Sequence, residues 1–241
     1  MARVNPLPRE RATVVVALDT SLSMQATDVE PDRITAARDS ASAFVEGLPD
    51  RFNVGLVSFS GSAAVVVSPT QDHLLVVDAV QRLELGPSTA IGDAVLASLD
   101  AIRAVPGEEG QPPPPARIVL LSDGTSTVGR PVPAAVEAAV EAGVPVSTIA
   151  YGTAEGVVEV QGQQIPVPVD QPALERLASS TGGSAFSAES GEELSAVYDD
   201  IGSQVGTTTE RREVTDVMTG VGLLLAVAAA AASLVWSARL P

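Results

Sequence analysis

Apolar residues follow two alternating patterns along the chain. Short, largely apolar runs alternate with longer stretches in which apolar residues recur every three or four positions. The short runs predict strands that are covered on both faces, and the longer stretches predict amphipathic helices. The runs predicted as strands are 12–18, 53–59, 62–68, 117–121 and 146–150. The run 62–68 follows 53–59 after the turn "SFSGS", which favours an antiparallel pairing of these two strands.

Helical periodicity is present in four stretches. They are 31–48, 90–105, 132–142 and the stretch that follows a capping box formed by Ser190 and Glu193. In 132–142, the spacing of Val132, Val136 and Val140 predicts that these valines face the core. Gly143 and Pro145 are expected to end this helix.

The order of the elements, β-α-β-β-α-α-β-α-β-α-β-α, predicts the fold class. Strands that alternate with helices indicate a doubly wound α/β fold, here with a mostly parallel sheet and one antiparallel edge strand. Two segments interrupt the order: 106–116 is a proline-rich polar connector, and 155–170 is expected to contain a small hairpin that turns at Gly162. The sequence therefore predicts one domain over 11–205, preceded by an N-terminal tail over 1–10.

The C-terminal part of the chain has the properties of a membrane anchor. Residues 217–238 carry no charge, and at about 1.5 Å per residue a helix of this length crosses a hydrocarbon layer of about 30 Å. Trp236 near one end is typical of the membrane interface. We expect a single-pass C-terminal transmembrane helix in the cell membrane, after a polar stalk over 206–216 and before a short tail over 239–241. The alternative is an alanine-rich helix buried in protein.

The composition excludes several classes of function. The 241 residues carry a formal net charge of −16, which disfavours nucleic acid as a partner because phosphate binding needs clustered positive charge. Every basic residue is arginine, so a Walker A phosphate loop, which requires lysine, is excluded. The chain has no cysteine, which excludes disulfides, thiolate metal sites and cysteine nucleophiles.

Oxygen-bearing side chains occur at the ends of two predicted strands and in one loop. Asp19 ends the first strand and is followed by Ser21 and Ser23, Asp123 ends the strand in "RIVLLSDG", and Thr89 lies in a loop that opens a helix. Ligands of open α/β sheets bind at the carboxyl ends of the strands. A donor set of oxygen atoms alone suits a hard divalent cation, so we expect Mg²⁺, with Mn²⁺ or Ca²⁺ as alternatives. The other interpretation of Asp19 and the two serines is a helix cap or a turn.

These five residues resemble the metal-ion-dependent adhesion site of von Willebrand factor type A domains. The resemblance implies that Ser21, Ser23 and Thr89 coordinate the metal directly, and that Asp19 and Asp123 act mostly through water. One coordination position then stays open for an Asp or Glu carboxylate of a protein partner. The resemblance therefore implies a protein-binding module that is not an enzyme.

The continuation "SMQATDVEPDRITAAR", with "STIAYGT" and the C-terminal span, is similar to bacterial aerotolerance-operon (Bat-type) proteins and to actinobacterial membrane proteins of the same layout. The likeness covers residues 10 to 205. It implies complex assembly or stress tolerance with a MoxR-type AAA+ ATPase and related membrane proteins of the same domain type. Family members carry two membrane helices before the first strand, whereas this chain begins almost at that strand. As written, the chain predicts a tail-anchored cytoplasmic domain, whereas the family layout places the domain outside the cytoplasm. Arginines flank both ends of the span, so the charge rule does not choose a side.

Two other functions are compatible with the same residues. One is a metal-assisted phosphohydrolase that uses Asp19, although a serine stands two residues later, where haloacid-dehalogenase-type enzymes have a second Asp. The other is a structural envelope component whose metal site is vestigial. The remaining polar residues of interest are expected to cap helices, to serve a structural role at a helix start or to lie in solvent: Asp28, Asp32, His73 and Asp93.

Overall fold

The computed structural model of the chain describes residues 6–8, 11–106, 114–124, 126–160, 162–205 and 207–209. They belong to two compact units, which are described separately. The smaller unit contains two short antiparallel strands, β1 (Pro6–Pro8) and β10 (Thr207–Thr209). The larger unit contains residues 11–205. The predicted membrane span over 217–238 lies outside the described residues, and no described helix is long and apolar enough to cross a membrane.

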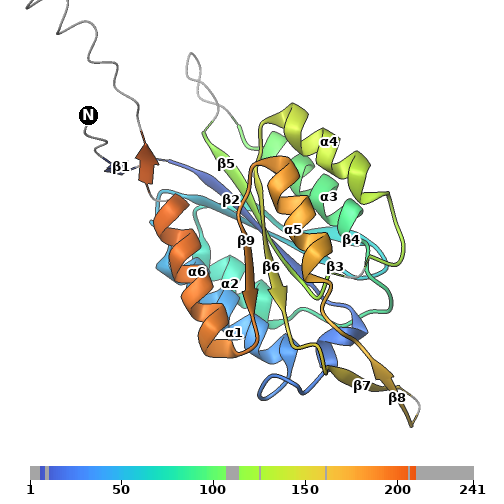
Figure 1. Cartoon of the computed structure of the whole chain (residues 1–241). Coiled ribbons are helices and arrows are strands. Elements are labelled where there is room, and N and C mark those ends of the chain that lie inside the picture. The colour runs from blue at the N-terminus through green and yellow to red at the C-terminus, as the bar shows by residue number, and fades with distance from the viewer. Residues whose placement is uncertain are drawn as a thin grey trace, which may run out of the picture. The chain divides into compact units, whose positions relative to one another are not determined.

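A six-stranded sheet forms the centre of the larger unit (Figure 1). Its strand order is β4-β3-β2-β5-β6-β9, and every neighbouring pair is parallel except β3 and β4. The predicted mostly parallel sheet with one antiparallel edge strand is therefore confirmed. The strands are β2 (Thr13–Asp19), β3 (Asn53–Phe59), β4 (Ala63–Thr70), β5 (Ala116–Ser122), β6 (Val146–Tyr151) and β9 (Ala185–Ala188).

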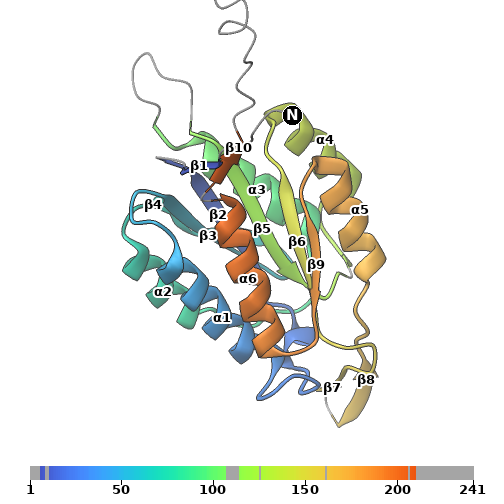
Figure 2. The ribbon, with the colours of Figure 1, turned by 60° about the vertical axis from the view of Figure 1, so that its left-hand side comes forward.

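Helices cover both faces of this sheet (Figures 1 and 2). Helices α1, α2 and α6 pack on one face, and α3, α4 and α5 pack on the other. The helices are α1 (Arg33–Gly47), α2 (His73–Gln81), α3 (Ile91–Arg103), α4 (Val132–Ala142), α5 (Gln171–Thr181) and α6 (Gly191–Val205), with a short 3-10 turn η1 (Leu22–Gln25) after β2.

Burial on both faces explains why the strands are apolar without alternation. All seven residues of β2 are buried. Val14 and Val16 contribute to the core beneath α1 and α6, whereas Val15 and Ala17 contribute to the core beneath α3 and α4. A strand covered by helices on both sides needs apolar residues at every position, as the sequence of β2 shows.

Helix ends are fixed by the capping residues that the sequence predicts. Asp32 accepts a hydrogen bond from the Thr35 amide at 2.8 Å and begins α1. Gly143 adopts the left-handed conformation and ends α4. Ser190 accepts a hydrogen bond from the Glu193 amide at 3.1 Å, as expected for a capping box before α6.

The inward face of α4 differs from the predicted one. Val140 is 56 % exposed, and Ala135 and Ala139 are the buried residues of this helix. Val132 and Val136 are half-buried beside them. The prediction for Val140 is wrong because the two alanines occupy the line of closest approach to the sheet, where small side chains let the helix backbone pack tightly.

A small hairpin projects from the end of the larger unit at which the parallel strands finish (Figures 1 and 2). Its strands are β7 (Val157–Val160) and β8 (Gln163–Pro166), and they pair antiparallel. Gly162 takes a positive φ of 79° in the turn, as the sequence predicts. The chain after β8 returns to the sheet edge that carries the predicted site, because residues 166–168 line that site.

Candidate metal centre

Strands β2 and β5 are parallel neighbours, so their carboxyl ends lie together at one edge of the sheet. This arrangement places Asp19 at the end of β2 and Asp123 directly after β5 at that edge. The Ser122 hydroxyl donates a hydrogen bond of 2.5 Å to Asp19 Oδ2 and so joins the two strand ends. Sequence reasoning missed Ser122, since its partner lies 103 residues away in the chain.

Asp19 is a fully buried carboxylate with both oxygen atoms held by protein donors. Its Oδ1 accepts a hydrogen bond from the Ser21 amide at 2.8 Å. Burial raises the pKa of Asp19 to about 7, and the charge of the nearby Asp123 adds to this effect. The fold therefore holds Asp19 where its negative charge is costly unless a positive charge lies close to it.

The hydroxyls of Ser21 and Ser23 provide a geometric test of the predicted cation. Their Oγ atoms are 2.8 Å apart. Neighbouring ligands of octahedral Mg²⁺, each at about 2.1 Å from the ion, lie about 3 Å from one another. The spacing of the two hydroxyls thus fits two adjacent ligands of one small divalent cation.

Hydrogen bonds at two places hold the Thr89 loop against the other site segments. Gly86 donates its amide to the Thr20 carbonyl at 2.8 Å, which fixes the start of this loop beside the end of β2. The Thr89 amide donates to Thr127 Oγ1 at 2.9 Å, and the Thr127 amide donates to the Thr89 carbonyl at 2.8 Å. These bonds tie the Thr89 loop to the loop that follows Asp123.

The predicted residues gather around one open hollow of about 380 Å³. Ser21, Ser23, Thr89 and Asp123 line it, and Asp19 is joined to this lining through its bond to Ser21. The other walls are Leu22, Ser88, Thr127, Pro166, Val167 and Pro168. The structure therefore brings together all five residues selected from the sequence.

The donor chemistry of this hollow differs from that of a carboxylate-rich or histidine-rich centre. Within the described part of the chain, no three His, Cys, Asp or Glu side chains form a metal-binding group. A cation in the hollow would depend on two carboxylates and three hydroxyls, the set to which Asp19, Asp123, Ser21, Ser23 and Thr89 contribute. Such a set suits a hard cation that keeps some of its water.

A buried arginine that the sequence did not single out lies behind the site. Arg33 Nη1 is 3.6 Å from Asp123 Oδ2. The guanidinium also binds Asp28 with two hydrogen bonds of 2.8 and 2.6 Å. Burial by itself would raise the pKa of Asp28, but the hydrogen bonds from Arg33 and Thr153 outweigh it and lower the pKa to about 2. The expectation that Asp28 caps a helix or lies in solvent is wrong, because Asp28 is instead the half-buried counter-ion of the buried Arg33.

The other polar residues considered from the sequence have local partners. Asp93 accepts a hydrogen bond of 2.7 Å from Arg130 Nε in the first turn of α3. His73, at the start of α2, lies 3.0 Å from the Phe52 carbonyl through Nε2. Neither residue lines the hollow.

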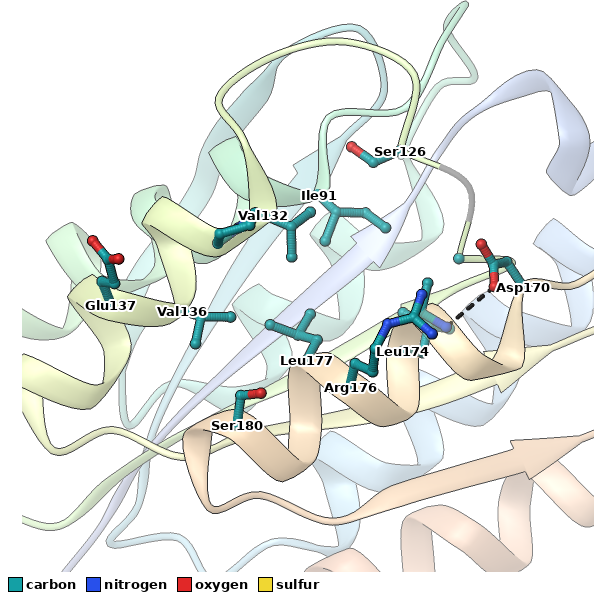
Figure 3. A pocket seen from close by; sticks show the side chains of 13 residues that line it. Ile91, Ser126, Val132, Val136, Glu137, Asp170, Leu174, Arg176, Leu177 and Ser180 are labelled. Carbon is teal, nitrogen blue, oxygen red and sulfur yellow. Dashed lines mark hydrogen bonds between the residues drawn. The ribbon is translucent and has the colours of Figure 1, made fainter.

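A second, mostly apolar groove of about 600 Å³ lies between α4 and α5 (Figure 3). Val132 and Val136 face Leu177 across it. Gly124 and Ser126 line this groove, whereas Asp123 and Thr127, their neighbours in the chain, line the hollow of the predicted site. Described residues of the segment after β5 therefore contribute to both cavities.

Comparisons with known proteins agree with this architecture. A family model described as von Willebrand factor type A domain matches residues 14–125. The UPF0353 protein of Mycobacterium marinum is 40% identical over 243 residues, a match that covers 98% of this chain and 72% of that protein. The UPF0353 protein of Nocardia farcinica is 40% identical over 255 residues, covering 99% of this chain and 76% of that protein.

Two solved structures share the fold. BatB from Bacteroides thetaiotaomicron has a TM-score of 0.68 at 24% identity, over 80% of this chain and 98% of the other. An aerotolerance-related membrane protein from Bacteroides fragilis has a TM-score of 0.71 at 22% identity, with the same coverage of 80% and 98%. The chain therefore belongs to the actinobacterial UPF0353 family, and its larger unit has the fold of a von Willebrand factor type A domain.

Proposed function

We propose that this protein is a membrane-anchored binding module that recognises a protein partner through a Mg²⁺-dependent adhesion site. The observation that carries the proposal is the convergence of oxygen donors from three separate segments on one open hollow. Residues 217–238 would anchor the module in the cell membrane. The partner would supply an Asp or Glu carboxylate to the open coordination position.

Each site residue has a distinct role in this proposal. Ser21, Ser23 and Thr89 would bind the cation directly, and these neutral ligands leave most of its charge available. Asp19 and Asp123 would act through water, and Asp19 supports this division because its two oxygens already accept hydrogen bonds from Ser21 and Ser122. When bound, the cation supplies a strong positive charge with one position open to a foreign carboxylate.

Binding is favoured over hydrolysis by the placement of Asp19. A nucleophilic carboxylate has to reach its substrate, yet Asp19 is buried and lies outside the lining of the hollow. The described lining also contains no histidine that could serve as a general base. We therefore propose a non-enzymatic role.

The cellular role that we propose is complex assembly or stress tolerance. It is supported by the shared fold with BatB and with the aerotolerance-related membrane protein from Bacteroides fragilis. A MoxR-type AAA+ ATPase and related membrane proteins with the same domain are the partners we propose. The acidic chain, at a net charge of −16, fits a partner that approaches through a bridging cation, because direct contact between two acidic surfaces is repulsive.

Calorimetry of the full-length protein with Mg²⁺ tests the adhesion site. Ser21→Ala should weaken Mg²⁺ binding by about tenfold or more, since it removes a direct ligand. Ser195→Ala makes the same change on α6, where the hydroxyl donates to the Gly191 carbonyl, and should leave the affinity unchanged. Absence of Mg²⁺ binding by the wild-type protein would rule the proposal out.

Recovery of partners from solubilised membranes tests whether the protein binds a partner through the cation. Wild-type protein in Mg²⁺ should retain a partner that is released by EDTA. Asp123→Ala should fail to retain it at the same Mg²⁺ concentration. Equal recovery with the variant would show that the partner binds elsewhere on the molecule.

A further inference from the structure

The guanidinium of Arg33 lies between Asp123 of the predicted metal site and Val167, a residue that lines the hollow. One side of the group forms the two hydrogen bonds to Asp28. Nη2 also donates to the Val167 carbonyl at 3.2 Å. The surrounding backbone is shaped to this group, because a β-carbon at Gly152 or Gly156 would lie 2.4 or 2.0 Å from guanidinium atoms.

The opposite side of the guanidinium faces the site. Nη1 is 3.6 Å from Asp123 Oδ2 and has no hydrogen-bond partner, although it is buried. A buried donor without a partner is uncommon, since it forfeits the hydrogen bond that water would have given it. Arg33 therefore has one side that is firmly held and one side that interacts with Asp123 through charge alone.

The segment held by Arg33 also forms part of the hollow. Pro166, Val167 and Pro168 line it beside Ser23 and Thr89. This short wall, residues 166–168, leads directly out of the β7–β8 hairpin. This wall borders the hollow, so its position affects access to the site.

We propose that Arg33 is a positioning residue that couples cation occupancy of the site to the placement of the wall at 166–168. The inference rests on the proposed adhesion site. The guanidinium is repelled when a divalent cation is held beside Asp123, and the acceptors on its far side are Asp28 and the carbonyls of Thr153 and Val167. Cation binding therefore tightens the bond from Arg33 to Val167 and orders the wall.

Arginine is required for this role because the group has to bind in two directions at once. Its planar fork holds both oxygens of Asp28 while a further nitrogen faces Asp123. A lysine at this position keeps the positive charge but presents a single ammonium group. Arg33→Lys therefore separates the effect of charge from the effect of the two-sided contact.

Hydrogen–deuterium exchange of the full-length protein, with and without Mg²⁺, tests the coupling. In the wild-type protein, Mg²⁺ should slow exchange of the amides in 153–168 by about fivefold or more, the usual size of coupling between two sites. Arg33→Lys should still bind Mg²⁺ but lose this slowing, and by reciprocity its affinity should fall by a similar factor. Arg82→Lys makes the same change at an exposed pair with Asp78 and should behave as the wild type.

Each result distinguishes this inference from the proposed function. A wild-type protein that binds no Mg²⁺ overturns both. A wild-type protein that binds Mg²⁺ without any change over 153–168 overturns the inference alone, as does a full response in Arg33→Lys. If Arg33→Lys does not fold, Asp28→Asn serves instead, because it weakens the fixed side of the guanidinium and should reduce the slowing while Asp123 is untouched.

Discussion

The fold that positions Asp19 also buries it completely. The six buried residues of β2 that precede it lead into Asp19, and its carboxylate lies near a second carboxylate, Asp123, at the same sheet edge. Folding alone does not favour such a pair, because each negative charge makes the other more costly in a low-dielectric environment. Arg33 offsets part of the Asp123 charge, and the proposed cation would offset both carboxylates.

The stability of the cation-free protein should depend on pH. The pKa of Asp19 is about 7 in the folded state against 3.8 as its reference value, so the folded protein retains a proton that the unfolded chain releases. The resulting stability is fully present below about pH 4 and is lost as pH rises to about 7, by roughly 4 kcal/mol at most. Urea unfolding in EDTA at several pH values measures this loss.

Two comparisons check the assignment of this pH effect to Asp19. Asp19→Asn should abolish the loss of stability between pH 4 and pH 7, since the amide does not titrate. Saturating Mg²⁺ should also reduce it by favouring the ionised carboxylate. A loss of the same size in Asp19→Asn would point to another group. Asp28 does not interfere, because its lowered pKa confines its own effect to more acidic solutions.

Arg33 and Asp28 should contribute to stability as a unit. Arg33→Met leaves the half-buried Asp28 carboxylate without its arginine, which should lower the free energy of unfolding by about 3–5 kcal/mol. The double variant Arg33→Met with Asp28→Asn no longer carries the Asp28 charge and should lose less, and the stability that it still loses includes the contact of Arg33 with Asp123. Chemical denaturation of the two variants gives the comparison. A double variant that is less stable than the single variant would contradict this account.

Residues with distant partners were the ones that sequence reasoning missed. Asp28 contacts Thr153, 125 residues further along the chain, and Ser122 contacts Asp19 at a separation of 103. No local pattern records such a contact. Ser21, Ser23 and Asp19 were recognisable because they follow one another at the end of a single strand.

At the scale of the elements, the first turn of α3 packs closely on the loop that follows Asp123. Gly92 is the second residue of this helix, and a β-carbon there would lie 2.1 Å from the Arg130 carbonyl oxygen. Two hydrogen bonds join the same loop to this region: Arg130 Nε donates to Asp93, and the Thr89 amide donates to the Thr127 hydroxyl. Close packing at Gly92 therefore keeps the Thr89 and Asp123 segments together.

Gly92→Ala should disrupt this packing. In a helix, alanine is normally better than glycine by up to about 1 kcal/mol, so a loss of stability here would have to come from the contact with Arg130. We expect a loss of about 1–3 kcal/mol, as for other overpacked positions, together with weaker Mg²⁺ binding. Thermal unfolding and calorimetry measure the two effects.

Gly47→Ala provides the matched control for this element. Gly47 is also helical, at the end of α1, and a β-carbon there meets nothing within 4 Å. The variant should be as stable as the wild type or slightly more stable, with unchanged Mg²⁺ affinity. Equal behaviour of the two glycine variants would show that the contact at Arg130 is unimportant.

The elements themselves were largely predictable, whereas some of their faces were not. Strand β2 and the capping box at Ser190 follow from local sequence, because burial on both faces and capping leave local signatures. The face of α4 was misjudged because the valine stripe ending at Val140 is more hydrophobic than the alanines that touch the sheet. How closely a helix approaches a sheet depends on the neighbouring elements, which one sequence does not specify.

For the whole molecule, two helical layers fix the sheet from both sides and leave the site at its edge. The core is therefore complete without a cation, and the proposed cation would add to a sheet that is already formed. The fold class followed from the alternation of elements, whereas the groove between α4 and α5 did not, since it depends on how two helices are spaced. A cation that binds only the folded molecule should stabilise the molecule as a whole.

Thermal unfolding tests this expectation. At a Mg²⁺ concentration 100 times its dissociation constant, linkage predicts an increase in Tm of about 5–10 °C for a domain of this size. Addition of EDTA should reverse the increase. Asp123→Asn should unfold at the same temperature with and without Mg²⁺, and a response equal to that of the wild type would place the cation elsewhere.

Strand β5 lies between β2 and β6 in the sheet, although it is synthesised only after β3 and β4. A growing chain that has emerged only as far as α3 already contains Asp19, both serines and Thr89, yet it lacks Ser122 and the second carboxylate. Such an intermediate cannot assemble the full set of oxygen donors. If the proposed adhesion site operates, a nascent chain should therefore be unable to hold the cation, or a partner through it, until β5 has emerged.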